Sequence, residues 1–264
     1  MRRLTVIAAA VVACALAGCS SSSSGSPSSS PSATHSATTA ATGSITVFAA
    51  SSLKESFTKL GKQFDALHPG DKVTFSFGPS SGLATQIVSG APADVVASAS
   101  TKNMQQVVTA GDASGPSDFA KNIMEVAVPP SNPAKITSVN DLAKSSVKVA
   151  LCQPLVPCGV TAAKVFANAK IVVKPVTLEP DVKSVLAKVE LGNVDAGMVY
   201  VTDVLAAGSK VKGVVIPATV DASTTYPIAT ISKSSQAATA QAFVTYVLSP
   251  AGQSVLTAAG FEKP

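Results

Sequence analysis

Short apolar runs alternate with longer stretches of helical periodicity along residues 44–264. The strand-like runs are rich in β-branched residues and cover residues 45–49, 73–77, 94–98, 123–128, 147–151, 171–177, 196–200 and 211–216. The helix-like stretches cover residues 53–67, 82–89, 102–110, 139–144, 160–167, 182–191, 202–207, 237–248 and 252–259. This alternation predicts an α/β protein built from strand–helix–strand units, with ligand crevices at the carboxyl ends of its strands.

The chain begins with a different pattern. Two arginines precede an apolar run over residues 4–17, which is shorter than a bilayer span and leads into Gly18 and Cys19. The sequence Leu-Ala-Gly-Cys resembles a bacterial lipobox, so we expect residues 1–18 to be a lipoprotein signal peptide. Lipid on Cys19 would then hold the chain on the extracytoplasmic face of the cell membrane. A plain signal peptide with an incidental cysteine is the alternative.

Residues 19–43 consist almost entirely of Ser, Thr, Ala, Pro and Gly, a composition that predicts a disordered tether. Loss of two arginines with the signal peptide leaves 18 basic and 15 acidic residues, a net charge of about +3. This excess is small, and no basic cluster contains interleaved aromatic residues. We therefore expect no nucleic-acid partner.

Four turns at which a strand gives way to a helix are rich in uncharged hydrogen-bond donors. They are Ala49-Ala50-Ser51-Ser52-Leu53, Phe77-Gly78-Pro79-Ser80-Ser81-Gly82, Pro154-Leu155-Val156-Pro157-Cys158-Gly159 and Glu179-Pro180-Asp181-Val182. Helix N-termini offer unpaired N–H groups and a positive dipole end, which suit an anion. Each turn alone is typical of ordinary capping, because a serine or an aspartate before a helix commonly caps it. Together they favour a fully deprotonated anion, because no Lys or Arg stands at a donor position and a protonated oxyanion would need an acceptor.

Acidic and aromatic residues near these turns also affect the expected site. Glu55 and Asp181 are interpreted as first-turn helix acids and Glu179 as exposed, so none of them is expected to face the anion. Tyr200 ends the strand-like run 196–200, where its hydroxyl could project into a cleft. A strand-end tyrosine is more often only a half-buried aromatic, so Tyr200 alone is a weak signal.

Several blocks of sequence resemble those of periplasmic, or more generally extracytoplasmic, molybdate-binding proteins of ABC transporters, within the type II solute-binding protein superfamily. The blocks cover residues 45–53 (ITVFAASSL), 80–87 (SSGLATQI), 90–95 (GAPADV), 156–159 (VPCG), 181–183 (DVK), 197–200 (GMVY) with Asp203, 226–229 (YPIA) and 249–252 (SPAG). They follow the order of the family across nearly all of the chain after residue 43. The resemblance therefore covers both the four turns and the C-terminal region.

The resemblance implies a two-lobe periplasmic-binding-protein fold of type II, in which each lobe is a mixed sheet flanked by helices. Residues 44–122 and 226–264 would form lobe 1, residues 123–225 would form lobe 2, and the ligand cleft would lie between them. The ligand shell of the family would fall on five positions. These are Ser52 and Ser80 through hydroxyl and amide groups, Cys158 and Val182 through their amides, and Tyr200 through its hydroxyl.

Cys158 departs from the alanine that the family commonly has at the third turn, and Cys152 stands six residues before it. In an exported protein this spacing favours a disulfide over a metal or redox pair, because it is neither CxxC nor a zinc pattern. Two free, buried thiols are the alternative. A bridge would hold the Cys158 amide in place and so preorganise that donor.

The resemblance implies the binding component of an ABC importer, which would capture molybdate, and tungstate comparably, for its permease and ATPase subunits. The oxyanion would be held by hydrogen bonds without direct metal ligands. The protein is expected to be a monomer that needs no cofactor and is not an enzyme. A sulfate or other tetrahedral oxyanion receptor on the same fold is the alternative within this class.

Two alternatives belong to other classes of protein. One is a hydrolase using Ser52 or Ser80, and the other is a surface adhesin or structural lipoprotein. The only histidines are His35 in the tether and His68 at an expected helix end, and neither is placed to serve a Ser–His–acid relay. The sequence also contains no cluster of His, Cys and carboxylates that would suggest a catalytic metal.

Overall fold

A computed structural model describes residues 43–264, so the expected signal peptide, Cys19 and nearly all of the tether lie outside the described residues. The strands are β1 (Ser44–Ala50), β2 (Lys72–Gly78), β3 (Val95–Ala97), β4 (Ser117–Val128), β5 (Val149–Cys152), β6 (Thr177–Glu179), β7 (Ala196–Tyr200), β8 (Lys212–Val215) and β9 (Ser223–Thr230). The helices are α1 (Lys54–Leu67), α2 (Ser80–Val88), α3 (Thr101–Thr109), α4 (Pro157–Ala169), α5 (Val182–Glu190), α6 (Val201–Ala207), α7 (Ala237–Leu248) and α8 (Pro250–Ala258). Short 3-10 turns cover Ser51–Leu53, Val139–Ala143 and Gly208–Lys210.

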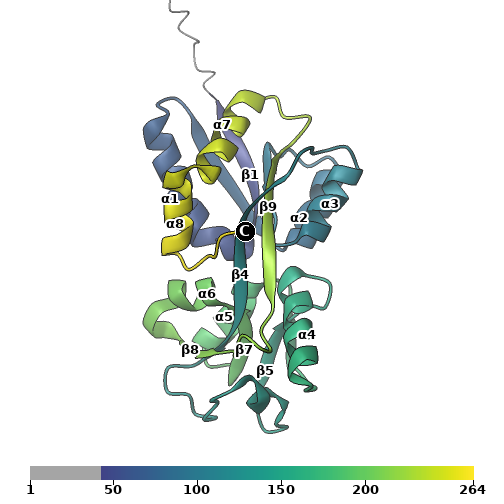
Figure 1. The fold of residues 1–264 in the computed structure, drawn as a ribbon, viewed down its shortest axis with the longest axis vertical. Coiled ribbons are helices and arrows are strands. Elements are labelled where there is room, and N and C mark those ends of the chain that lie inside the picture. The colour runs from purple at the N-terminus through teal and green to yellow at the C-terminus, as the bar shows by residue number, and fades with distance from the viewer. Residues whose placement is uncertain (1–42) are drawn as a thin grey trace, which may run out of the picture. The chain divides into compact units, whose positions relative to one another are not determined.

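The strands are hydrogen-bonded in the order β2-β1-β3-β9-β4-β7-β5-β6, and β8 pairs with β4. The long strand β4 belongs to two lobes (Figure 1). Its first part pairs with β9, and its second part pairs with β7 and β8. The first lobe, at the top of Figure 1, contains β1, β2, β3, most of β9, and helices α1, α2, α3, α7 and α8. The second lobe contains β5 to β8 and helices α4, α5 and α6.

Parallel pairing directs the strand ends of each lobe to one edge. β1 pairs in parallel with β2 and β3 in the first lobe, and β5 pairs in parallel with β6 and β7 in the second. The turns that follow these strands therefore leave each sheet on the same side. As a result, several helix N-termini of the two lobes come close together between the lobes.

Each lobe has its own hydrophobic core. In the first lobe, the ring centroid of Phe57 lies 5.7 Å from that of Phe119 and 6.2 Å from that of Phe243, within the range of favourable aromatic packing. In the second lobe, mainly aliphatic side chains such as Val185 and Met198 pack between helices and the β4, β5 and β7 strands. The separate cores let each lobe hold its own strand-end turns in position.

Three strands differ from the pattern-based prediction, and one of them, β4, begins at Ser117, six residues before the expected strand 123–128. The expected strand 171–177 is replaced by β6, which begins only at residue 177, because Pro175 cannot donate a ladder hydrogen bond and restricts the residue before it. The strand β9 was absent from the pattern-based set because Pro227 interrupts its apolar run. In the structure Pro227 lies next to an irregularity in the pairing with β4, where a strand tolerates proline.

Candidate anion-binding site

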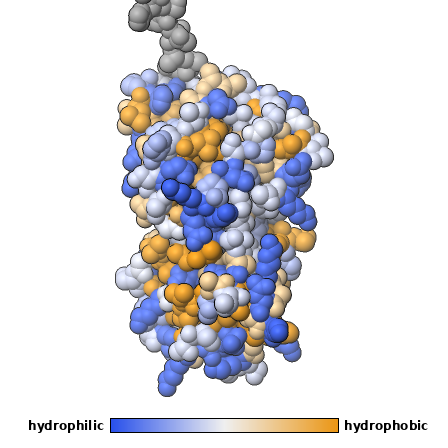
Figure 2. Space-filling view, in the orientation of Figure 1, coloured by the Kyte–Doolittle hydropathy of each residue, from blue (hydrophilic) through white to orange (hydrophobic). Residues whose placement is uncertain are grey.

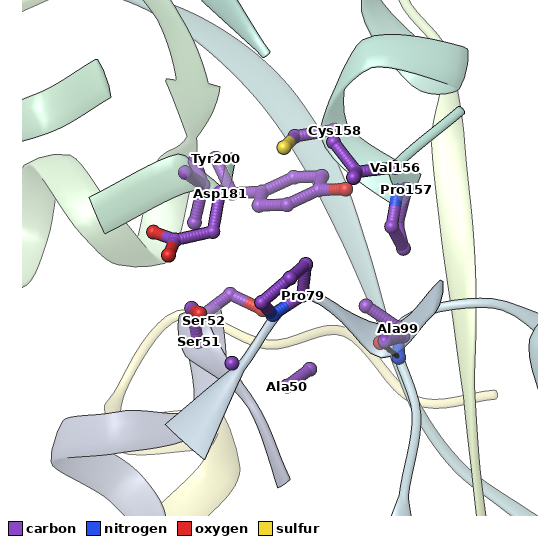
Figure 3. A pocket seen from close by; sticks show the side chains of 13 residues that line it. Ala50, Ser51, Ser52, Pro79, Ala99, Val156, Pro157, Cys158, Asp181 and Tyr200 are labelled. Atoms are coloured by element: carbon purple, nitrogen blue, oxygen red, sulfur yellow. Dashed lines mark hydrogen bonds between the residues drawn. The ribbon is translucent and has the colours of Figure 1, made fainter. Parts of the chain in front are cut away.

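A small cavity lies where the turns of the two lobes meet (Figure 3). Its volume is about 20 Å³, whereas a cavity needs roughly 10–15 Å³ to hold one water molecule. In this conformation the cavity therefore has room for a small group only, and it is too small for a sugar or an amino acid. It is lined by Ala50, Ser51, Ser52, Gly78, Pro79, Ser80, Ala99, Val156, Pro157, Cys158, Asp181, Val182 and Tyr200.

All five residues expected to contact a ligand line this one cavity: Ser52, Ser80, Cys158, Val182 and Tyr200. Each lies where a strand ends. Ser52 lies in the 3-10 turn after β1, and Ser80 begins α2. Cys158 is in the first turn of α4, Val182 begins α5, and Tyr200 ends β7. The structure thus brings them together, while their contacts with a ligand remain predictions.

The hydroxyl of Ser52 does not cap a helix, which was the alternative role for a serine in this turn. Its Oγ instead lies 2.8 Å from the hydroxyl of Tyr226. Asn122 Nδ2 donates to Tyr226 Oη (3.5 Å) and to Thr202 Oγ1 (2.8 Å), and Asn122 Oδ1 accepts from the Ile123 amide. Either hydroxyl can donate in this contact, and the bond that Tyr226 accepts from Asn122 leaves the Tyr226 proton available for Ser52. With Tyr226 as the donor, Ser52 is the acceptor. The proton of Ser52 is then free for an acceptor in the cavity.

Ser80 is held in a similar way from its own lobe. Its Oγ accepts a hydrogen bond from the Ala99 amide at 2.9 Å, and the side chain is buried. This contact uses an acceptor position of the hydroxyl and leaves its proton available. Ser52 and Ser80 therefore both present a donor to the cavity.

Cys158 lies in the first turn of α4, which begins three residues earlier than the pattern predicted, with Pro157 at the first helical position. Cys152 and Cys158 are joined by a disulfide, with 5.8 Å between their Cα atoms. Gly159 lets this loop fold tightly onto the helix, because a Cβ there would lie only 2.1 Å from Gln153 O. The Cys158 amide is thus part of a short, cross-linked turn.

The fourth turn contains two acids, Asp181 and Glu179, whose environments differ from the prediction. Asp181 is the N-cap of α5 and not a first-turn acid, because its Oδ1 accepts from the Ser184 amide at 3.0 Å. Figure 3 shows its carboxylate pointing away from the Tyr200 hydroxyl. Glu179 was expected to be exposed, but its side chain is only 12 % exposed and its Oε1 accepts from Thr177 Oγ1 at 2.7 Å. Its strand position in β6 and this hydrogen bond explain the burial.

Tyr200 is 1 % exposed, so it is not the half-buried aromatic that strand ends usually carry. Its hydroxyl has no hydrogen-bond partner among residues 43–264. Burial, with a smaller contribution from Tyr226, raises the pKa of Tyr200 well above its ordinary value, and the nearby Thr161 side chain offsets only a small part of this effect. The hydroxyl therefore stays protonated, and it is a buried donor at the cavity wall without an acceptor of its own.

Asp181 lines the cavity although none of the acids was expected to face the anion, and the other polar groups of the lining are dipoles and hydroxyls. None of its lining residues is Lys, Arg or His. No group of His, Cys, Asp or Glu among residues 43–264 could hold a metal ion. The arrangement suits an anion bound by neutral donors, since helix N-termini and hydroxyl protons are directed at the same small volume.

Sequence reasoning missed two residues that hold the site. Tyr226 appeared in a recognised block without a role, and Asn122 was not singled out. Tyr226 is fully buried, and burial raises its pKa strongly although its hydrogen bonds with Ser52 and Asn122 lower it. No local pattern could have identified them, because both act on Ser52 from distant strands.

A two-lobed α/β chain with a small cavity between its lobes has the architecture that is typical of solute-binding proteins. Residues 45–262 match the family model of bacterial extracellular solute-binding proteins. The chain belongs to this family. Its members bind solutes outside the cytoplasm and are not enzymes, which agrees with the expected class. Within residues 43–264, no helix combines the length and apolar character that crossing a membrane requires.

Comparison with individual proteins gives the same class. The molybdate-binding protein ModA of Mycobacterium tuberculosis is 44% identical, over 84% of this chain and 85% of that protein. The periplasmic molybdate-binding protein of Azotobacter vinelandii has a similar structure, with a TM-score of 0.75 at 21% identity over 83% of this chain and 99% of that one. The sulfate-binding protein SubI of Mycobacterium tuberculosis has a TM-score of 0.75 at 20% identity, over 83% and 86% of the two chains. These two structural similarities establish the two-lobe fold.

Proposed function

We propose that this protein captures molybdate outside the cytoplasm and delivers it to the permease and ATPase subunits of an ABC importer. The observation that carries the proposal is the convergence of donors from four strand-to-helix turns and Tyr200 on one cavity of about 20 Å³ without a cationic side chain. The 44% identity to a molybdate-binding relative supports molybdate as the anion. The oxyanion is a transported ligand and not a cofactor.

The proposed shell consists of Ser52 and Ser80 with hydroxyl and amide groups, the amides of Cys158 and Val182, and the Tyr200 hydroxyl. These groups only donate to the ligand, so they favour a fully deprotonated dianion. Tungstate has the same charge and nearly the same size, and it binds comparably. Sulfate has shorter bonds than molybdate, so donors that are placed for the larger ion cannot all reach hydrogen-bond distance from sulfate. Each stretched contact loses part of roughly 1.5–3 kcal/mol.

Closure of the lobes is part of the proposal. Residues 44–122 with 226–264 move as one body and residues 123–225 as the other, about β4 and β9. These two strands cross between the lobes, as Figure 1 illustrates. The separate hydrophobic cores of the two lobes support rigid-body motion, because each core stays packed when the lobes separate.

The N-terminal sequence supports anchoring of the protein. Residues 1–18 act as a lipoprotein signal peptide, Cys19 carries the lipid, and residues 19–43 tether the binding unit to the membrane. The protein acts as a monomer beside its permease. Mass spectrometry of the exported chain, showing diacylated or triacylated Cys19 at the new N-terminus, tests this part.

Isothermal titration of the exported chain with molybdate, tungstate and sulfate tests the ligand. We expect one site for molybdate and tungstate and much weaker binding of sulfate. Ser52→Ala and Ser80→Ala should each weaken molybdate binding by about 1–3 kcal/mol. Sulfate binding as tight as that of molybdate would favour the sulfate receptor, and absence of binding to any of the three anions would refute the proposed function.

A further inference from the structure

Lys183 lies between two carboxylates that belong to different lobes. Its Nζ is 2.9 Å from Asp203 Oδ1 in the second lobe and 2.7 Å from Glu55 Oε2 in the first lobe. The Lys183 side chain is 19 % exposed, Asp203 is fully buried and Glu55 is half exposed. Burial lowers the pKa of Lys183, but the two carboxylates outweigh this effect and raise it, so Lys183 remains a cation.

The contact with Asp203 supports the wall of the second lobe. Asp203 Oδ2 accepts from the Tyr200 amide at 3.0 Å, while Oδ1 faces Lys183. Lys183 directly follows Val182 in the chain. One buried ion pair therefore connects the turn that carries Tyr200 to the turn that carries Val182, and this connection lies within a single lobe.

The contact with Glu55 crosses between the lobes. Glu55 stands three residues after Ser52, in the first turn of α1, and α5 contacts the 3-10 turn Ser51–Leu53. The ion pair thus joins the Ser52 wall of the cavity to the Val182 wall, immediately outside the cavity. Separation of the lobes would break this pair and leave the Lys183–Asp203 pair intact.

We propose that the Glu55–Lys183 ion pair is a clasp that forms on closure, holds the two walls of the cavity together and slows release of the bound anion. This proposal rests on the proposed function. Glu55 and Lys183 act as positioning residues, because neither lines the cavity. The ion pair adds a contact that the open form lacks, so breaking it adds to the free energy that is needed to release the anion. The ion pair therefore lowers the dissociation rate.

Because Glu55 is negatively charged, its two possible roles predict changes of opposite sign when the charge is removed. A carboxylate close to a bound dianion opposes binding by Coulomb repulsion, so its removal on that ground alone would speed association or tighten binding. Loss of a clasp has the opposite effect and speeds dissociation. The sign of the change in Glu55→Gln therefore separates the two roles. Lys183→Met is less informative because it leaves Asp203 buried without its cation.

The experiment measures molybdate association and dissociation in the exported full-length chain by stopped-flow tyrosine fluorescence. The chain has three tyrosines and no tryptophan, so Tyr200 at the cavity wall contributes a large share of the signal. We expect Glu55→Gln to release molybdate about two- to fivefold faster with unchanged association, the range for a partly exposed ion pair. Added salt should speed release from the wild type and narrow this difference.

Glu190→Gln is the matched control. Glu190 lies 4.0 Å from Lys210, and both residues belong to the second lobe, so its loss breaks no contact between lobes. We expect this variant to release molybdate at the wild-type rate, and thermal melts to show that both variants are folded. Release from Glu55→Gln at the wild-type rate or slower, with wild-type binding intact, would overturn the clasp alone. A wild type that binds no molybdate in titration would overturn the proposed function and the clasp together.

Discussion

Removal of the Tyr200 hydroxyl should not destabilise the ligand-free protein, but it should weaken the binding of molybdate. Tyr200→Phe removes a hydroxyl that is buried and has no partner among residues 43–264. The ring, which packs with its centroid 6.4 Å from that of Tyr226, is kept. In the ligand-free protein the substitution therefore removes no hydrogen bond within the protein, whereas in the complex it removes a donor to the anion.

The expected magnitudes follow from this difference. An unsatisfied buried hydroxyl costs about 1–3 kcal/mol, so the ligand-free variant should be as stable as the wild type or more stable by up to about 2 kcal/mol. That gain corresponds to a melting temperature up to about 4–8 °C higher for a chain of this size. A hydrogen bond to a charged ligand contributes about 1.5–3 kcal/mol, so the dissociation constant for molybdate should rise about 10- to 150-fold.

Calorimetric melts of the ligand-free variant and titrations with molybdate measure the two quantities on the same preparations. Ser81→Ala is a suitable control, because Ser81 follows Ser80 in α2 and does not line the cavity. A Tyr200→Phe protein that binds molybdate like the wild type would refute the role of the hydroxyl. A ligand-free variant destabilised by more than about 1 kcal/mol would show that the hydroxyl has a partner in the protein, contrary to the reasoning.

Three further predictions concern residues around the site. Tyr226→Phe removes the hydroxyl that is hydrogen-bonded to Ser52, so titration should show molybdate affinity several-fold lower, with an effect smaller than that of Tyr200→Phe. Replacing Cys152 and Cys158 together by alanine should lower the free energy of unfolding by about 2 kcal/mol in urea melts, as expected for opening a short cross-linked loop. Alkylation of both thiols in the unreduced wild type would contradict this. Burial, followed by the charge of Asp221, raises the pKa of Glu125, so its contribution to stability is present at acid pH and lost as pH rises through the raised pKa. Glu125→Gln should therefore melt above the wild type at neutral pH, and the difference should vanish towards acid pH.

Local patterns predicted most of the elements because most of the helices and strands follow simple apolar periodicities. The expected helix 237–248 coincides with α7, and the expected strand 196–200 coincides with β7. Prediction was wrong where proline interrupts an apolar run, as Pro227 does in β9. The structure accommodates that proline through an irregular pairing with β4, which is a property of the partner strand and not of the local sequence.

The donor turns can be predicted from the amino-acid sequence, because a strand followed by serine, glycine or proline and then a helix is a local signal of an exposed helix N-terminus. The cysteine pair and the family resemblance are also visible in the sequence. Which groups lie side by side depends on how distant segments pack. Ser52 and Tyr226 are 174 residues apart in the chain, yet their hydroxyls share a hydrogen bond. The Glu55–Lys183 contact likewise exists because β4 and β9 cross between two separately packed lobes. The periodicity of apolar residues shows which face of a helix or strand is buried. The contacts between distant side chains depend on the order of the strands and on the closure of the lobes.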